Sequence, residues 1–360
     1  MGRITLRIAF SRVLYLGTII SVLGPSLSLG PHANAATADG VAQSERAVSF
    51  TGANGVKLAG TLLVPAHEPD AKIAGVIIVA GSGPTDRDGN SALLNVKINL
   101  LKQIAEQLAQ EGIASLRYDK RGQYASGEAP TDRELLYAFT LWENYVGDTA
   151  AALAYLQEQA EIDANRTAMI GHSEGGMLIL QAAVEGKGFH KPPAALVLAS
   201  TPGRRADVIM REQVGSDLVA MFFLKKNDEI MEAIEQTGRV PGDVPFALAS
   251  LYPPEFGKFA QSMFKFDGPV RASRFPGPVL VLAGAKDLQH KADLETAALS
   301  AGLRRRQPDD HEVYIVPEAS HNLKRVRSDY DHAFAGDFAP EAAAKLRTWL
   351  GKKLCSTRGE

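Results

Sequence analysis

Apolar and polar residues alternate near the start of the chain, and continuous apolar runs follow further on. Residues 47–51 and 56–64 flank Ala53-Asn54-Gly55, whose Asn-Gly pair is a strong signal for a hairpin turn. The second segment partly alternates, which suits an antiparallel strand with one wetter face. We therefore expect a β-hairpin at the start of the folded chain.

Short apolar runs rich in valine and isoleucine come after this hairpin. Runs of this kind are typical of strands that are buried on both faces of a sheet. Between them, apolar residues recur at spacings of three and four, and this spacing predicts helices. Alternating strands and helices imply right-handed crossovers, so we expect an α/β fold with a mostly parallel, eight-stranded sheet flanked by helices. The runs occupy residues 73–80, 113–116, 167–170, 194–199, 279–283 and 313–316.

The segment between Ser200 and Pro276 interrupts the alternation, because it has helix-like stretches and no strand-like run. We expect residues 204–275 to form a helical cap, inserted between a first core part at 36–203 and a second at 276–354, with a tail at 355–360. The large apolar residues of the cap could line an acyl pocket or pack the cap onto the core, and the sequence leaves both open. They are Met210, Leu218, Met221, Phe222, Phe223, Leu224, Phe256, Phe259, Met263 and Phe264.

The N-terminus has the pattern of a secretory signal peptide. Three arginines precede an uncharged, mainly apolar stretch over residues 13–23, and Ala33-Asn34-Ala35 supplies the small residues of a cleavage site. The apolar stretch is short for a bilayer span, and an uncleaved membrane anchor is the alternative. We expect residues 1–35 to be removed and the protein to be exported to a periplasm or to the medium.

Composition removes several classes of function. With 360 residues, 45% hydrophobic and 22% charged, the chain is an ordinary globular protein. Its 39 basic and 41 acidic residues leave no surplus to neutralise phosphates, so nucleic acid is not the expected partner. The single cysteine, Cys355, allows no intrachain disulfide and no thiolate metal site, and the sequence lacks His-Glu-x-x-His. We expect no metal and no cofactor.

The strongest motif is Gly-His-Ser-Glu-Gly at residues 171–175, which follows one predicted strand and precedes a predicted helix. A serine in this context sits on a tight strand-to-helix turn that exposes its hydroxyl at the carboxyl edge of the sheet. Serine is a weak nucleophile that needs a base. The motif therefore predicts Ser173 as a nucleophile, against the alternative of an ordinary glycine-rich turn.

Two later residues complete a catalytic triad in the order Ser, Asp, His that this architecture favours. His321 lies in the loop after the last predicted strand and is the predicted base, with His290 as the next candidate. Asp287 follows another strand at the same edge of the sheet and would orient His321, with Asp293 as a weaker rival. The alternative role of Asp287 is to cap a helix from residue 288 onward.

A glycine-rich loop after the first buried strand predicts an oxyanion hole. In Ala80-Gly81-Ser82-Gly83-Pro84, the glycines free the backbone to point N–H groups inward. We expect the donors to be the backbone N–H groups of Ser82 and Glu174. A phosphate-binding loop is excluded, because no Gly-Lys-Ser/Thr ends it and no third glycine stands at the dinucleotide spacing.

With these elements the chain resembles the α/β-hydrolase superfamily over most of residues 46–352. The segments 81–90, Gly-Ser-Gly-Pro-Thr-Asp-Arg-Asp-Gly-Asn, and 117–122, Arg-Tyr-Asp-Lys-Arg-Gly, resemble a bacterial esterase subgroup labelled serine aminopeptidase-like or S33-like. The resemblance implies a carboxylesterase acting on short acyl esters, with Ser173, Asp287 and His321 as its triad. One position departs from the subgroup, because Tyr124 stands where it has glycine.

Three functions remain open at this point. The first is a carboxylic ester hydrolase with a small-molecule ester as substrate, and the second is a peptidase or amidase that uses the same triad. A non-catalytic binding protein with the same fold is the third, and the complete set of catalytic elements argues against it. The charged residues near the expected mouth are expected to form a structural network, with substrate contact as the alternative. They are Asp86, Arg87, Asp119 and Arg121.

Overall fold

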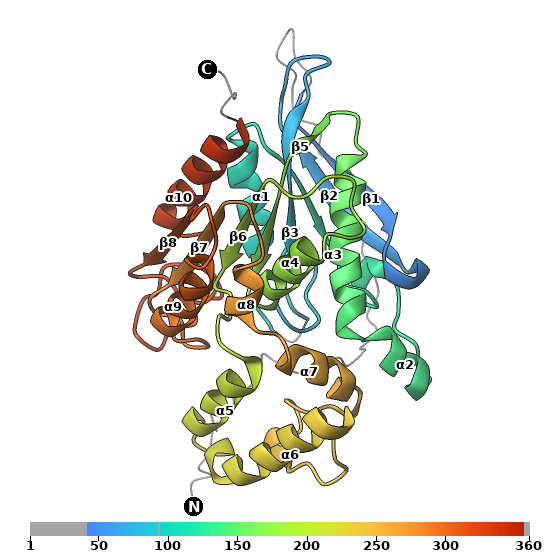
Figure 1. The fold of residues 1–360 in the computed structure, drawn as a ribbon, viewed down its shortest axis with the longest axis vertical. Coiled ribbons are helices and arrows are strands. Elements are labelled where there is room, and N and C mark those ends of the chain that lie inside the picture. Colours follow the sequence, from blue (N-terminus) through green and yellow to red (C-terminus); the bar gives the residue numbers. More distant parts are fainter. Residues whose placement is uncertain (1–41, 93, 356–360) are drawn as a thin grey trace, which may run out of the picture.

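The centre of the molecule is a sheet of eight strands in the order β1-β2-β4-β3-β5-β6-β7-β8 (Figure 1). The computed structural model describes residues 42–92 and 94–355. Strands β1 and β2 are antiparallel to their neighbours and the others run parallel, which confirms the predicted fold class. The strands are β1 (Ser44–Thr51), β2 (Lys57–Val64), β3 (Ile73–Val79), β4 (Ala114–Tyr118), β5 (Ile162–His172), β6 (Ala195–Ala199), β7 (Val279–Gly284) and β8 (His311–Val316).

The predicted hairpin is present at the antiparallel edge. Strands β1 and β2 pair from Ser44 opposite Val64 to Thr51 opposite Lys57. Asn54 and Gly55 turn the chain with φ angles of 56° and 75°. Asparagine and glycine tolerate this left-handed region better than other residues, which explains why the Asn-Gly signal marks the turn.

Helices cover both faces of the sheet, and each face has its own apolar cluster (Figure 1). Ile77 and Ile78 are adjacent in β3, yet one belongs to each cluster, and both are fully buried. Burial on both faces is why the central strands have continuous apolar sequences. One face carries α3 (Trp142–Gln157), α4 (Glu174–Glu185) and α9 (Ala292–Leu303), and the other carries α1 (Leu100–Ala109) and α10 (Pro340–Leu350). A short helix, α2 (Arg133–Phe139), precedes α3.

The segment between β6 and β7 is helical. It contains α5 (Ala206–Ser216), α6 (Leu224–Thr237), α7 (Gly257–Phe264) and α8 (Gly268–Ala272), with short 3₁₀ turns between them. Figure 1 shows α5, α6 and α7 grouped beyond one end of the sheet. We call α5 to α7 the cap; its boundaries at residues 204 and 275 stay predictions.

The cap uses most of its apolar residues for packing. Met210, Phe256, Phe259 and Phe264 are buried in the same cluster as α3 and α4. Leu218 and Phe222 instead remain more than four-fifths exposed, at 82% and 81%. The large apolar side chains of this segment therefore mainly attach the cap to the core.

The cap is joined to the core through Arg204, just before α5. The guanidinium of Arg204 donates to Glu295 on α9 and to Glu212 on α5. Glu295 is buried, and it also accepts the backbone N–H groups of Gly203 and Arg204. Buried carboxylates are stable when every oxygen has a donor, so this cluster fixes where the cap leaves the core.

None of the helices in the described ranges is long and apolar enough to cross a membrane. The proposed signal segment, residues 1–35, lies outside those ranges. Cys355 is exposed and carries a free thiol.

Candidate active site

Ser173 occupies a strained turn between β5 and α4. Its φ and ψ angles are 55° and −124°, a region that non-glycine residues rarely adopt. The Ser173 N–H donates to the carbonyl of Ala199 at 2.8 Å, and the Ser173 carbonyl accepts from Gly176 at 2.9 Å. Such strain persists only where the surroundings impose it, and it clusters at functional sites. The predicted nucleophile turn is therefore present in its geometry.

Two glycines allow this turn to press against the end of β3. A Cβ atom on Gly175 would lie 2.3 Å from the carbonyl oxygen of Val79, and one on Gly171 would lie 2.3 Å from that of Gly175. Neither approach is compatible with any other residue. The close packing brings the loop after β3 to Ser173, where the Gly81 Cβ position is 3.1 Å from the Ser173 Cβ.

Ser173 lines a pocket of about 790 Å³, its open mouth included, between the sheet edge and the cap. The predicted residues Ser82, Glu174 and His321 line the same pocket. Of the cap residues considered from the sequence, Met263 lines it. Its other apolar lining residues are Ile98, Leu100, Leu101, Met177, Pro202, Ala206 and Ile209.

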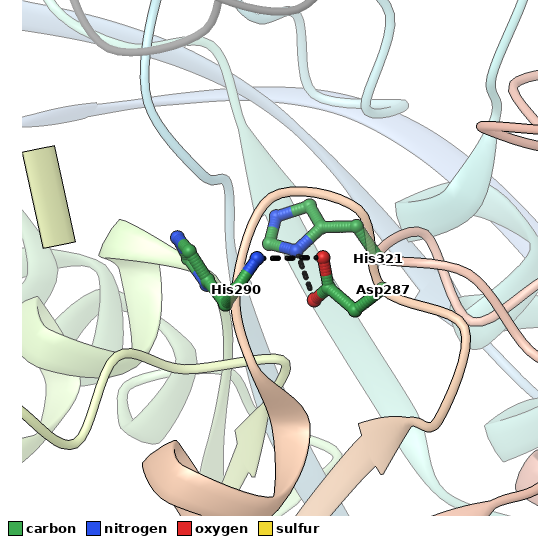
Figure 2. Close-up of side chains that lie close together, drawn as sticks. All are labelled: Asp287, His290 and His321. Carbon is green, nitrogen blue, oxygen red and sulfur yellow. Dashed lines mark hydrogen bonds and ion pairs between the residues drawn. The ribbon is translucent and has the colours of Figure 1, made fainter. Parts of the chain in front are cut away.

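His321 and Asp287 form a buried hydrogen bond of 2.7 Å between Nδ1 and Oδ2 (Figure 2). The other Asp287 oxygen accepts the backbone N–H groups of Gln289 and His290. Burial raises the pKa of Asp287, but the charge and hydrogen bonds of His321 outweigh it and lower the pKa overall. An ionised Asp287 fixes the proton of His321 on Nδ1 and leaves Nε2 as the basic nitrogen.

Asp287 does not cap a helix, which was its alternative predicted role. Helix α9 begins at Ala292, with Lys291 before it. Asp287 instead holds the turn that leads toward α9 while it contacts His321. The rival carboxylate, Asp293, is exposed in the first turn of α9.

The two residues predicted to supply the oxyanion donors, Ser82 and Glu174, line the same pocket as Ser173. Glu174 is the first residue of α4, so its N–H has no acceptor within the helix. Ser82 lies in a tight turn, in which the Thr85 hydroxyl donates to the Ser82 carbonyl at 3.1 Å. The structure therefore brings Ser82, Ser173, Glu174 and His321 together, with Asp287 directly behind His321.

Two further histidines pack against His321. The ring of His290 lies 4.8 Å from that of His321, nearly perpendicular to it, and also lines the pocket. The Nε2 of His172 donates to the backbone carbonyl of His321 at 3.0 Å, which confines that ring to a supporting position. Burial, and then the charge of His321, lowers the pKa of His172 to about 3 and that of His290 to about 4. Both rings are neutral at pH 7, so neither adds a positive charge beside His321.

From the sequence, His290 is predicted only as an alternative base, and its contact with His321 is not predicted. The available signal was its position three residues after Asp287, in the same loop. Asp287, His290 and His321 each bring one potential metal-ligand atom within 4.8 Å of the others (Figure 2). A metal ion bound there would compete for the atoms that join His321 to Asp287.

Acid is expected to destabilise the fold through the buried His172. An unfolded histidine titrates near pH 6.5, whereas the folded pKa is about 3. Between these values the unfolded chain binds the extra proton, so the free energy of unfolding falls as the pH falls. From pH 7.5 to pH 5 this histidine should account for a loss of about 2 kcal/mol.

Urea unfolding of the wild type and of His172→Gln at both pH values measures this loss. The difference in free energy of unfolding between the wild type and His172→Gln should be about 2 kcal/mol smaller at pH 5 than at pH 7.5. An equal difference at both pH values would contradict the assignment.

A buried ion pair involves Glu174, one of the two predicted oxyanion donors, and the sequence did not predict it. The Nζ of Lys120, just after β4, donates to the Glu174 carboxylate at 2.8 Å, and both side chains are less than 10% exposed. Lys120 belongs to the motif at 117–122, which was the only signal for it. The pair neutralises a carboxylate that adjoins the nucleophile.

The charged residues of the two long motifs are held by ion pairs and hydrogen bonds within the fold. Arg87 forms a two-pronged ion pair with Asp119, and Arg121 forms one with Asp148. Asp86 accepts the backbone N–H groups of Asp88 and Asn90. None of the four residues expected near the mouth is among the described residues that line the pocket.

Lys324 connects the loop that carries His321 to the wall of the pocket through hydrogen bonds. Its buried ammonium donates to the backbone carbonyls of Ile98, Phe334 and Gly336. Ile98 lines the pocket, and Lys324 stands three residues after His321. A fully buried lysine needs such acceptors, so its position is closely determined.

Comparisons with known proteins support the fold described above. Residues 94–244 match the family model described as serine aminopeptidase, S33. An esterase of Pyrococcus furiosus, Pf2001, is 16% identical with a TM-score of 0.56, over 87% of this chain and 92% of that one. The α/β hydrolase GrgF from Penicillium sp. sh18 is 18% identical with a TM-score of 0.53, over 87% of this chain and 99% of that one.

A peptidase is also similar in structure. The acylaminoacyl peptidase of Pyrococcus horikoshii is 12% identical with a TM-score of 0.54, over 89% of this chain and 43% of that one. No curated protein matches the sequence. At these identities the structural likenesses show the fold, and the fold is that of the α/β-hydrolases, as the sequence motifs indicated.

Proposed function

We propose that this chain, whose fold is that of the α/β-hydrolases, is a serine hydrolase that cleaves carboxylic esters through an acyl-enzyme. The observation that supports this most is the strained Ser173 in one pocket with His321, whose Nδ1 is bonded to the buried Asp287. This arrangement supplies a nucleophile, a base and an orienting carboxylate.

In the proposed reaction, Nε2 of His321 takes the proton of Ser173 as Oγ bonds to the ester carbonyl carbon. The carbonyl oxygen becomes an oxyanion that accepts from the N–H groups of Ser82 and Glu174. The tetrahedral intermediate then expels the alcohol oxygen, which receives the proton from His321. Water repeats these steps on the acyl-enzyme, releasing the acid and restoring Ser173. Asp287 remains ionised throughout.

The pocket favours an ester over the substrate of an aminopeptidase. Binding a free α-ammonium group requires an available carboxylate. Glu174 is the only acidic residue among the described residues that line the pocket, and Lys120 already pairs with it. A neutral substrate with an apolar acyl group suits the remaining lining, which includes Ile209 and Met263 of the cap. We propose short acyl chains from the resemblance of segments 81–90 and 117–122 to the esterase subgroup.

Parallel assays of the purified protein test the substrate class. We expect p-nitrophenyl acetate to be hydrolysed with a much higher kcat/KM than aminoacyl p-nitroanilides. An N-acetylated aminoacyl anilide belongs in the same series, because a blocked amine needs no carboxylate and represents the amidase alternative. A clear preference for either anilide would overturn the ester assignment, and a series of acyl lengths would delimit the acyl group.

Lys120→Met is expected to lower kcat for an ester about tenfold. The substitution removes the partner of Glu174, and an unpaired buried carboxylate opposes the developing oxyanion. Lys120→Arg keeps the positive charge and should retain most of the activity. Steady-state kinetics at pH 7.5, with thermal melting as a check on folding, measures the effect.

Lys226→Met is the matched control for this lysine. Lys226 forms an exposed pair with Asp243 in the cap, so its loss should change kcat less than twofold. If Lys120→Met retained full activity while folded, the electrostatic role of the pair would be refuted.

We also propose that the protein is exported, from the sequence of residues 1–35 alone. Expression of the full chain in a bacterium should give a mature protein whose N-terminus lies near residue 36, in the periplasm or medium. Recovery of the intact chain with the membranes would indicate the anchor alternative.

A further inference from the structure

We propose that Tyr124 is a positioning residue for the oxyanion loop, defined here as residues 81–92. This inference rests on the proposed function, because it assigns Tyr124 the task of holding the N–H of Ser82 in place. Tyr124 occupies the position at which the chain departs from the subgroup that it resembles.

The hydroxyl of Tyr124 bridges Pro84, near the start of the oxyanion loop, and Ala92 at its end. It donates to the carbonyl of Pro84 at 3.0 Å and accepts the N–H of Ala92 at 3.0 Å. Between these points Thr85 and Ser91 form an isolated antiparallel bridge. The Tyr124 hydroxyl therefore closes the loop beside the bridge between Thr85 and Ser91.

The turn around Pro84, which Tyr124 holds, adjoins the pocket. Thr85 donates through its hydroxyl to the carbonyl of Ser82 and through its N–H to that of Gly83. Fixing Pro84 thus fixes the turn that orients the Ser82 N–H. Thr85, Gly89 and Ser91 also line the pocket, so the hydrogen bonds of the Tyr124 hydroxyl also hold one wall of the pocket in place.

The backbone of Tyr124 is strained. Its φ angle is 49°, a region that glycine adopts without cost and tyrosine rarely occupies. The nearby Gly122 also has a positive φ, of 66°. A strained residue persists when contacts elsewhere hold it, and the contacts that hold Tyr124 include both hydrogen bonds to the loop. Its side chain is 45% exposed, so apolar burial alone does not account for the strain.

The state of the hydroxyl fits this role. Partial burial raises the pKa of Tyr124 above its ordinary value of 10, and the charges of Asp86 and Asp119 act in the same direction. The phenol therefore keeps its proton and can donate to Pro84 throughout the pH range of an ester assay.

A separate contact keeps the loop folded when Tyr124 is changed. Arg87, in the middle of the loop, pairs with Asp119, which also accepts the N–H of Ala125. Tyr124→Phe leaves these bonds in place and removes only the hydroxyl. It therefore separates fine positioning from overall folding.

The experiment compares the wild type, Tyr124→Phe and Tyr137→Phe. Tyr137 lies on α2, where its hydroxyl accepts from Arg133, and in the described part of the chain it has no hydrogen bond to the loop. We expect Tyr124→Phe to lower kcat for p-nitrophenyl acetate about tenfold with KM changed less than twofold, because a misplaced oxyanion donor affects mainly the transition state. Amide hydrogen exchange of peptides covering residues 82–92 should become faster in this variant alone. Tyr137→Phe should match the wild type in both measurements.

Two results would overturn the proposal. Unchanged exchange in residues 82–92 would show that the hydroxyl does not hold the loop. Faster exchange with unchanged kcat would show that the tie is structural and does not serve catalysis. The exchange measurement requires no turnover, so an inactive wild type would count against the proposed function, and the exchange result would still decide whether Tyr124 holds the loop. Circular dichroism melting of each variant verifies that it is folded.

Discussion

Ser173→Ala is expected to lower kcat for ester hydrolysis by about 10⁴-fold or more while the fold is retained. The substitution removes the hydroxyl that forms the acyl-enzyme, and the remaining oxyanion hole and binding pocket give only residual catalysis. Alanine tolerates the Ser173 φ of 55° no better than serine does, so the melting temperature should change little. Initial rates on p-nitrophenyl acetate and a thermal melt measure the two effects.

Ser82→Ala is the matched control, because Ser82 is a second serine that lines the same pocket. The substitution keeps the backbone N–H that is proposed to contact the oxyanion, so kcat should fall less than about threefold. If Ser82→Ala were inactive and Ser173→Ala active, the nucleophile would be misassigned.

The second large effect is expected from Asp287→Asn, which should lower kcat about 10⁴-fold at neutral pH. The amide can present its NH₂ group to Nδ1 of His321, which would shift the ring proton to Nε2 and leave no base for Ser173. His321 accounts for the low pKa of Asp287, so the wild-type residue is charged at pH 7. The kcat of the variant from pH 6 to 9 measures the effect.

Asp293→Asn tests the rival carboxylate. Asp293 is exposed in the first turn of α9 and makes no contact with His321 that the structure shows among its described residues. Its variant should keep at least half of the wild-type kcat. Equal losses in both variants would argue against Asp287 as the orienting residue.

The sequence predicted most of the fold because its local signals agree with its burial. Strands such as β3 are covered on both faces, which leaves an unbroken apolar run, and the Asn54-Gly55 pair marks the turn between β1 and β2, where both residues have a positive φ. The proposed catalytic residues could also be predicted, since parallel strands place their carboxyl ends at one edge of the sheet. Ser173 and His321 each follow such an end, and both line the pocket.

Contacts between distant segments could not be predicted in this way. The pairing of Lys120 with Glu174 joins positions far apart in the chain, and the packing of His290 on His321 depends on how two loops meet. The carbonyl ligands of Lys324 are backbone groups, which leave no residue-specific trace in a sequence. Tyr124 was recognised as a departure from the subgroup, but its two hydrogen bonds required the structure.

Composition also could not predict which apolar residues of the cap line the pocket. Its large apolar residues suited both a pocket and a packing surface, and periodicity does not distinguish the two uses. In the structure Met263 and Phe264 are both buried in the same core cluster, and Met263 also lines the pocket, so one residue serves both uses. Ala206 and Ile209 line the pocket although neither was considered for it.

Labelling with a fluorophosphonate, followed by peptide mass spectrometry, tests directly whether Ser173 is an activated nucleophile. Such a reagent modifies a serine only when a base and an oxyanion site activate it. One adduct is expected, on the peptide that contains Ser173, and no adduct in Ser173→Ala or after denaturation. An unlabelled folded protein, or an adduct on Ser82 instead, would contradict this prediction.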